Sequence, residues 1–172
     1  MIRISREAIV DIRVEGVLRP VRSDLTPVNA TSRDLAAAAG DELQERLLRL
    51  GALPSGGAVV TPGGNLGADF VIHVVVMSEE EPQTEASVRR AVENGLRRAS
   101  DIGLESLAMP PLGLGVGVAE PEDAARALLG LLLDHLDEKS PPLDLRIVVS
   151  SEYESDLFTQ ALEELERERR QA

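Results

Sequence analysis

The chain of 172 residues has no cysteine and no tryptophan, and it has only two phenylalanines and one tyrosine. Without cysteine it has no disulfide, no thiolate nucleophile and no thiolate metal site. Because its two histidines are isolated and lack a nearby acidic pattern, we expect no metal site and no bound cofactor. The first residues, MIRISREAIVDI, lack the apolar stretch of a signal peptide, so we expect a cytoplasmic protein.

Basic residues are also in short supply. The chain has 18 lysine and arginine residues against 30 aspartate and glutamate residues, which gives a net charge of −12. Such a chain repels a nucleic-acid backbone, so we expect no nucleic-acid partner. A composition of 43% hydrophobic and 28% charged residues is typical of a globular chain and argues against disorder and against a membrane protein. The length predicts one domain over residues 1–172, and the sequence leaves its oligomeric state open.

The apolar residues recur at intervals of about two and about 3.6, which predicts short strands and amphipathic helices. Three strands are expected before the first helix, and helices alternate with strands after it. This order predicts an α/β fold, a three-layer α/β/α sandwich with a mixed, largely parallel central sheet. We expect strands at residues 2–4, 8–14, 16–21, 58–61, 69–77, 106–110 and 145–149, and helices at 32–50, after Pro82, from Glu120-Pro121 and from about 155, with a frayed tail at 166–172.

Alternate glycines mark the best candidate site. Gly113, Gly115 and Gly117 follow an expected strand and precede an expected helix. Backbone N–H groups in such a loop can point at an anion without obstruction by side chains, which predicts a phosphate cradle. The alternative is a tight turn that only packs. The second glycine cluster, PGGNLG at residues 62–67, joins two strands and is interpreted as a connecting turn.

A few polar and aromatic residues are further candidates. Arg19 and Arg22 flank Pro20 at the end of a strand, where they could reach an anion held by the glycine loop or remain solvated. Tyr153 follows the last strand, and its ring could stack on a base or cover the core. The histidine in the apolar run FVIHVVV, His73, is expected to be a core residue hydrogen-bonded to backbone.

These features together resemble the macro domain family, α/β/α modules that bind ADP-ribose and related nucleotides. The segment SLAMPPLGLGVGVAEPEDAARALL looks like the family's second loop, in which a strand, the pattern G-x-G-V-x-G and a helix handle the pyrophosphate. The segment TPGGNLGADFVIHVVV is similar to another stretch of the family, in which the histidine is structural. The matching positions are Gly113, Gly115, Val116 and Gly117, with Leu114 between them, and Thr61, Gly64, Leu66, Ala68, Ile72 and His73.

The chain departs from the family pattern in its first half. Arg19 and Arg22 stand where the family has two asparagines, the second of which helps to position the distal ribose. Ala8, followed by Ile9, replaces the aspartate that hydrogen-bonds the adenine amino group. The family's glycine-rich first loop appears here as VNATSRDLAAAAG, in which the side chains of Asn29, Thr31 and Ser32 stand near the expected phosphate site.

The resemblance implies a divergent module that binds ADP-ribose or a related phosphorylated nucleotide. Its expected contacts are residues 113–117, Ala8, Ile9, Arg22, the loop residues Asn29, Thr31 and Ser32, and Tyr153. Two alternatives stay open. The first is a hydrolase of an ADP-ribose ester in which Asp24 or Asp34 orients water, and the missing asparagines count against it. The second is an interaction scaffold that has lost nucleotide binding.

Overall fold

A computed structural model describes residues 1–113 and 119–172. Its centre is one six-stranded sheet, with five parallel-oriented strands and one strand that pairs antiparallel at an edge. In chain order the strands are β1 (Ile2–Arg6), β2 (Gly16–Arg22), β3 (Ala58–Pro62), β4 (Phe70–Met77), β5 (Ser106–Met109) and β6 (Asp144–Val149). Their order across the sheet is β1-β6-β5-β2-β4-β3, and β3 is the antiparallel strand.

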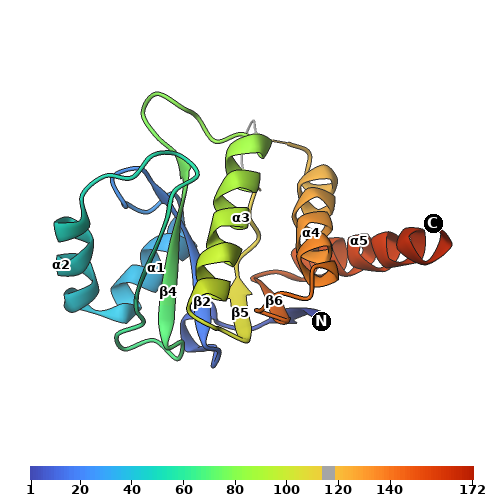
Figure 1. Ribbon diagram of the computed structural model, residues 1–172, viewed down its shortest axis with the longest axis horizontal. Helices are drawn as coiled ribbons and strands as arrows, with labels where there is room; N and C mark the ends of the chain where they lie inside the picture. The colour runs from blue at the N-terminus through green and yellow to red at the C-terminus, as the bar shows by residue number, and fades with distance from the viewer. Residues whose placement is uncertain (114–118) are drawn as a thin grey trace.

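Helices cover both faces of this sheet, which makes the three layers that the sequence predicts. The helices are the short 3-10 helix η1 (Ile9–Asp11) and the α-helices α1 (Ala30–Ala39), α2 (Asp41–Leu50), α3 (Glu85–Asp101), α4 (Pro121–Asp137) and α5 (Glu152–Gln171). The largest apolar cluster joins one face of the sheet to α3, α4 and α5. Smaller clusters join the other face to η1, α1 and α2, so the two groups of helices lie on opposite sides, as Figure 1 shows.

The two inner strands β2 and β4 form the buried centre of the sheet. Six successive residues of β4, from Val71 to Val76, are buried, which agrees with a strand covered on both faces. Alternate residues serve alternate faces, because Ile72 and Val74 pack with the α3 side and Val75 packs with the α1 side. The same alternation in β2 sends Leu18 to the α3 side.

The strand expected at residues 8–14 is not formed. The chain there contains η1, closed by a hydrogen bond from the Asp11 N–H to the Ala8 carbonyl oxygen at 3.0 Å. The physical reason is the strand order: β1 lies at one edge, and the chain must cross β6 and β5 to reach β2. It therefore leaves the plane of the sheet, and Ile12 packs on the face of β5 and β6 against Ala108 and Val148.

The single helix expected at residues 32–50 is two helices. Gly40, with φ of 101°, separates α1 from α2. The backbone N–H of Asn65, in the turn between β3 and β4, donates to the Ala39 carbonyl oxygen at 3.0 Å and so ends α1. Because this contact joins residues far apart in the chain, the sequence around residue 40 indicates the break only through Gly40 itself. Gly51 follows the end of α2, as the pattern predicts.

The tail expected to fray is helical. Helix α5 begins at Glu152, where the Ser151 hydroxyl accepts the Glu154 N–H, and continues to Gln171. Near its end Arg169 pairs with Asp134 and Asp137 of α4, which holds the last turns against the neighbouring helix. Figure 1 shows α5 running outward past α4 to the C-terminus.

Two glycine-to-alanine changes test how tightly the turn at residues 62–67 is packed. A Cβ atom at Gly63 would lie 1.9 Å from the Ala68 carbonyl oxygen, whereas one at Gly130 in α4 would meet nothing within 4 Å. We expect Gly63→Ala to lower the free energy of unfolding by at least about 2 kcal/mol. Gly130→Ala should raise it by about 0.5 to 1 kcal/mol, because alanine favours helix. Urea unfolding measures both, and equal effects would contradict the described turn.

Candidate ligand site at the switch point

The site begins where β2 and β5 part. These neighbours are paired only at Gly16–Leu107 and Val17–Ala108, although β2 continues to Arg22. Pro20 has no N–H for a ladder, and its carbonyl oxygen accepts the Ser32 hydroxyl at 2.5 Å. Beyond this point β2 leads to α1 on one face and β5 leads toward α4 on the other. We call the ends of these two strands, with residues 23–32 and the described part of 110–121, the switch point.

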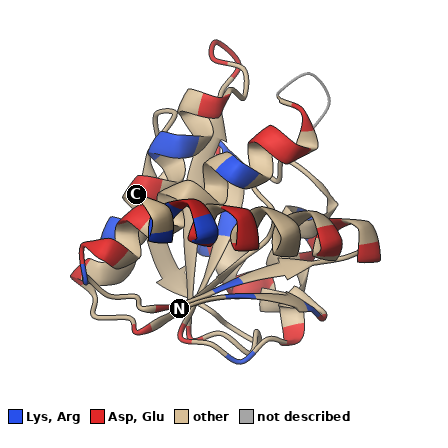
Figure 2. Cartoon of the chain, turned by 90° about the vertical axis from the view of Figure 1, so that its right-hand side faces the viewer, with Lys and Arg blue, Asp and Glu red and all other residues tan. Residues whose placement is uncertain are grey.

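Switch points in open α/β sheets are where ligands bind, and helix N-termini supply the N–H groups for anions. Helix α4 begins here at Pro121, and its N-cap residue Glu120 makes no side-chain cap hydrogen bond. Helices α1, α3 and α5 are each capped by a side chain, whereas α2, which follows Gly40, also lacks one. Figure 2 shows that acidic residues, in red, recur over the helices of the molecule. The first turn of α4 also carries Glu122 and Asp123. A bound anion must therefore face the N–H groups and avoid these carboxylates.

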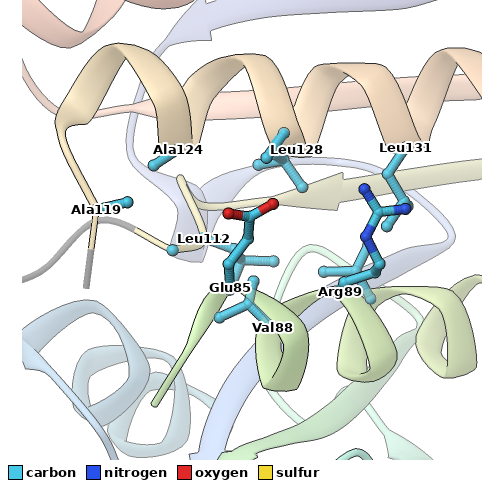
Figure 3. Close-up of a pocket in the computed structure, with 11 residues that line it drawn as sticks. Glu85, Val88, Arg89, Leu112, Ala119, Ala124, Leu128 and Leu131 are labelled. Carbon is cyan, nitrogen blue, oxygen red and sulfur yellow. The ribbon is translucent and has the colours of Figure 1, made fainter.

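Most of the predicted phosphate loop is not described. Leu114, Gly115, Val116 and Gly117 lie outside the described residues. Gly113, at its start, lines a narrow pocket of about 30 Å³ between α3 and α4. Its walls are mainly apolar, and the side chains of Glu85 and Arg89 point from α3 toward α4 across it (Figure 3). With so small a volume and mainly apolar walls, this pocket does not suit a phosphate.

Arg19 is neither solvated nor open to a ligand, which corrects both expectations for this residue. Its side chain is buried with 1% exposure, under the first turn of α1. Its Nε donates to the Ser32 carbonyl oxygen at 2.8 Å, and its Nη1 donates to Nδ1 of His73 at 3.1 Å. Burial lowers the pKa of Arg19 to about 10, so the guanidinium stays charged at neutral pH. The alternation of β2 gives the reason, because Val17, Arg19 and Val21 share the covered face.

His73 is a core residue, but its partners are side chains and not the backbone. Arginine can only donate, so Nδ1 of His73 accepts from Arg19 and the ring proton lies on Nε2. Nε2 is 2.9 Å from the Thr61 hydroxyl, to which it donates. Burial and the nearby charge of Arg19 lower the pKa of His73 to about 3. The neutral imidazole therefore ties β3, β4 and β2 together beneath α1.

The side chains of the first loop mainly make hydrogen bonds within the protein. The Asn29 side chain accepts the Ser32 N–H at 2.9 Å and caps α1. The Ser32 hydroxyl is buried on Pro20, while Thr31 is half-buried in the first turn. The Asn29 side chain and the Ser32 hydroxyl are thus engaged within the fold, and the role of these loop residues as ligand contacts stays a prediction.

Arg22 and Gly113 border different hollows. Arg22 is exposed at the end of β2 and lines a shallow hollow of about 620 Å³ together with Leu53 and Glu79. No residue of that hollow belongs to the pocket at Gly113. The predicted pairing of Arg22 with the glycine loop is therefore not seen in the described residues.

Strands β1 and β6 lie side by side and pair in parallel up to Arg6–Val149. Ala8 and Ile9 follow β1, and Tyr153 follows β6. Ala8 is exposed and Ile9 is half-buried. Tyr153 is 60% exposed and lines a hollow of about 280 Å³ between α4 and α5, so its ring does not cover the core. Glu122, in the first turn of α4, lines the same hollow.

Several polar residues around the site have no signal in the sequence pattern. The carboxylate of Glu7, next to Ala8, accepts the Ser5 hydroxyl at 2.9 Å and lies 3.5 Å from Arg146. Glu85 and Arg89 were also not predicted, because their i,i+4 spacing on a helix is too common to mark a pocket.

Among the described residues, no three His, Asp or Glu side chains are arranged to hold a metal ion. No helix in the described ranges combines the length and apolarity of a membrane span.

The fold and the switch point define a mixed α/β module whose strand ends form the candidate site, and comparisons with known proteins identify its family. The pattern of the family described as Macro domain matches residues 20–128. A macro domain-containing protein of Caldanaerobacter subterraneus is 27% identical over 172 residues, 96% of this chain and 98% of that protein. An uncharacterized protein of Aeropyrum pernix is 35% identical over 129 residues, 73% of this chain and 67% of that protein.

Some relatives are longer than this chain. An uncharacterized protein of Mycobacterium tuberculosis is 27% identical over 134 residues, 78% of this chain but only 37% of that protein. Solved macrodomains share the fold: one of Oceanobacillus iheyensis has a TM-score of 0.84 at 22% identity, with 97% of this chain and 92% of that chain covered. One of Trypanosoma brucei has a TM-score of 0.82 at 19% identity, covering 94% and 68%. The chain belongs to the macro domain family.

The buried imidazole of His73 predicts a pH dependence of stability. Its pKa falls from 6.5 in the unfolded chain to about 3 in the folded protein. Between these values the unfolded chain binds a proton that the folded protein does not, so the free energy of unfolding falls as the pH drops below 6.5. The slope approaches about 1.4 kcal/mol per pH unit. Urea unfolding between neutral pH and pH about 5 measures it, in a range that avoids most carboxylate titration. His73→Gln can still accept from Arg19 and should lose the slope; an unchanged slope would contradict the assignment.

Proposed function

We propose that this protein binds ADP-ribose, or a related phosphorylated nucleotide, at the switch point and acts as a binding module. The observation that carries the proposal is the start of α4: a long helix without a side-chain cap, directly after the glycine-rich segment and at the end of β5. Such a helix start offers N–H groups and a positive dipole to a phosphate. Support comes from two of the similar structures, which are macrodomains with ADP, and from a third with ADPR.

We further propose that the base of such a ligand lies within reach of the same helix. The hollow at Tyr153 includes Glu122 of α4, so a phosphate at the start of α4 and a base on Tyr153 would share one end of the sheet. The tyrosine ring offers a stacking surface. Ala8 offers no side-chain acceptor for an adenine amino group, and the Glu7 carboxylate beside it is turned to Ser5 and Arg146. We therefore expect stacking to contribute more than base-specific hydrogen bonds.

We expect binding without turnover. A water-activating base needs a carboxylate that faces the ligand. The Asp24 carboxylate instead accepts the N–H and hydroxyl of Thr26, and these bonds lower the pKa of Asp24. Asp34 is exposed on α1, 4.0 Å from Arg33. Neither carboxylate is supported by a partner that would orient it toward a substrate.

Isothermal titration calorimetry at fixed low salt tests the proposal, with ADP-ribose as the ligand and ADP, AMP and ribose 5-phosphate as comparisons. We expect saturable binding of ADP-ribose at micromolar strength and weaker binding of the fragments. If every ligand is silent up to millimolar concentration, the protein has the macro fold without this ligand, and the proposal is wrong.

Replacing Gly115 with leucine tests the glycine segment. A side chain at this position should keep the phosphates from the backbone N–H groups, so the heat of ADP-ribose binding should disappear. The melting temperature without ligand should stay near the wild-type value. Gly130→Ala, another glycine change remote from the switch point, should bind as the wild type does. Retained binding by Gly115→Leu would remove this segment from the site.

Replacing Tyr153 tests the base position. Because the ring is 60% exposed, Tyr153→Ala should leave the free energy of unfolding nearly unchanged. It should weaken ADP-ribose binding by about 1 to 3 kcal/mol through lost stacking. Tyr153→Phe keeps the ring and should keep the affinity. Ribose 5-phosphate has no base, so its affinity should be the same in all three proteins, and an equal loss for this fragment would place the ring elsewhere.

A further inference from the structure

The unusual feature of the interior is the buried positive charge of Arg19, which no carboxylate of the described residues neutralises. Arg19 is the largest of the fully buried side chains among the described residues. Both of its hydrogen bonds go to neutral acceptors, the Ser32 carbonyl oxygen and the imidazole of His73. Within the described ranges it takes part in no ion pair, and burial alone accounts for its lowered pKa. Buried arginines are normally paired, because an unpaired charge in the interior is costly.

The position of this charge relates it to the switch point. Arg19 lies two residues beyond Val17, in the part of β2 that has left β5. It is tied to the first turn of α1 through Ser32, whose hydroxyl holds the neighbouring Pro20. The guanidinium therefore lies in the wall between β2 and α1, on the β2 side of the switch point. Water and salt screen a charge in this interior much less than a charge on the surface.

We infer that Arg19 determines the preference of this site for anionic ligands, through the field of its buried charge and without touching the ligand. The inference rests on the proposed function, because it concerns the same site. An uncompensated cation raises the affinity for phosphate at the strand ends and disfavours a cationic ligand there. It also adds attraction that the chain's excess of acidic residues would otherwise oppose.

A purely structural role for Arg19 makes different predictions. In that case Arg19 matters because its planar guanidinium makes two hydrogen bonds, and lysine could not replace it. If its charge matters, lysine can replace it, while any change that neutralises the charge weakens phosphate binding. His73→Asp is such a change, because it sets a carboxylate beside the guanidinium and leaves Arg19 in place.

The test measures ADP-ribose affinity by calorimetry, at low salt and at about 1 M salt, for the wild type and for Arg19→Met, Arg19→Lys and His73→Asp. Arg22→Met, which removes an exposed cation from the same strand, is the matched control. We expect Arg19→Met and His73→Asp to bind about tenfold more weakly at both salt concentrations, and Arg19→Lys to bind within about threefold of the wild type. Any loss in Arg22→Met should vanish at high salt.

Thermal unfolding shows which variants are folded. If Arg19→Met does not fold, His73→Asp still tests the inference, because it neutralises the charge while leaving Arg19 in place. If Arg19→Lys binds as weakly as Arg19→Met, or if His73→Asp binds as the wild type does, Arg19 is structural and the inference is wrong while the proposed function stands. If the wild type itself binds no ADP-ribose, the proposed function fails and the inference fails with it.

Discussion

The candidate site exists because β2 and β5 part early. Two parallel strands that stay paired leave no room at their ends, but here the ladder stops after Val17 and Ala108. Pro20 lies just beyond, without an N–H and with its carbonyl oxygen taken by Ser32. The chain after β2 then turns to one face of the sheet and the chain after β5 to the other, which brings the start of α4 and the first turn of α1 to the same end.

A second interaction holds the α1 side of this arrangement. Arg19, His73 and Thr61 form a buried chain of hydrogen bonds across three strands, and the Ser32 carbonyl joins it to α1. The tautomer of the imidazole follows from arginine being a donor only. The same cation that orders the neutral histidine is left without a counter-charge, so one residue links the packing of α1 to the electrostatics of the site.

Local patterns were enough for the elements that the chain builds from its own periodicity. The apolar run of β4, the helix start at Pro121 and the glycines after β5 are all visible in the sequence. The break at Gly40 depends on Asn65, and η1 depends on the strand order, so neither could be found locally. The burial of Arg19 could have been predicted from the sequence. Val17, Arg19 and Val21 alternate along the strand and so share one covered face, but a prediction based on charge alone places an arginine in solvent.

We propose that the ligand lies at the strand ends and not in the apolar pocket between α3 and α4. The most direct measurement is an amide chemical-shift titration of the isotope-labelled protein with ADP-ribose. We expect the largest saturable shifts at Ala8, Glu122 and Tyr153, which follow β1, begin α4 and follow β6, respectively. Shifts confined to pocket residues such as Val92 and Leu131, or no shifts at all, would contradict this proposal.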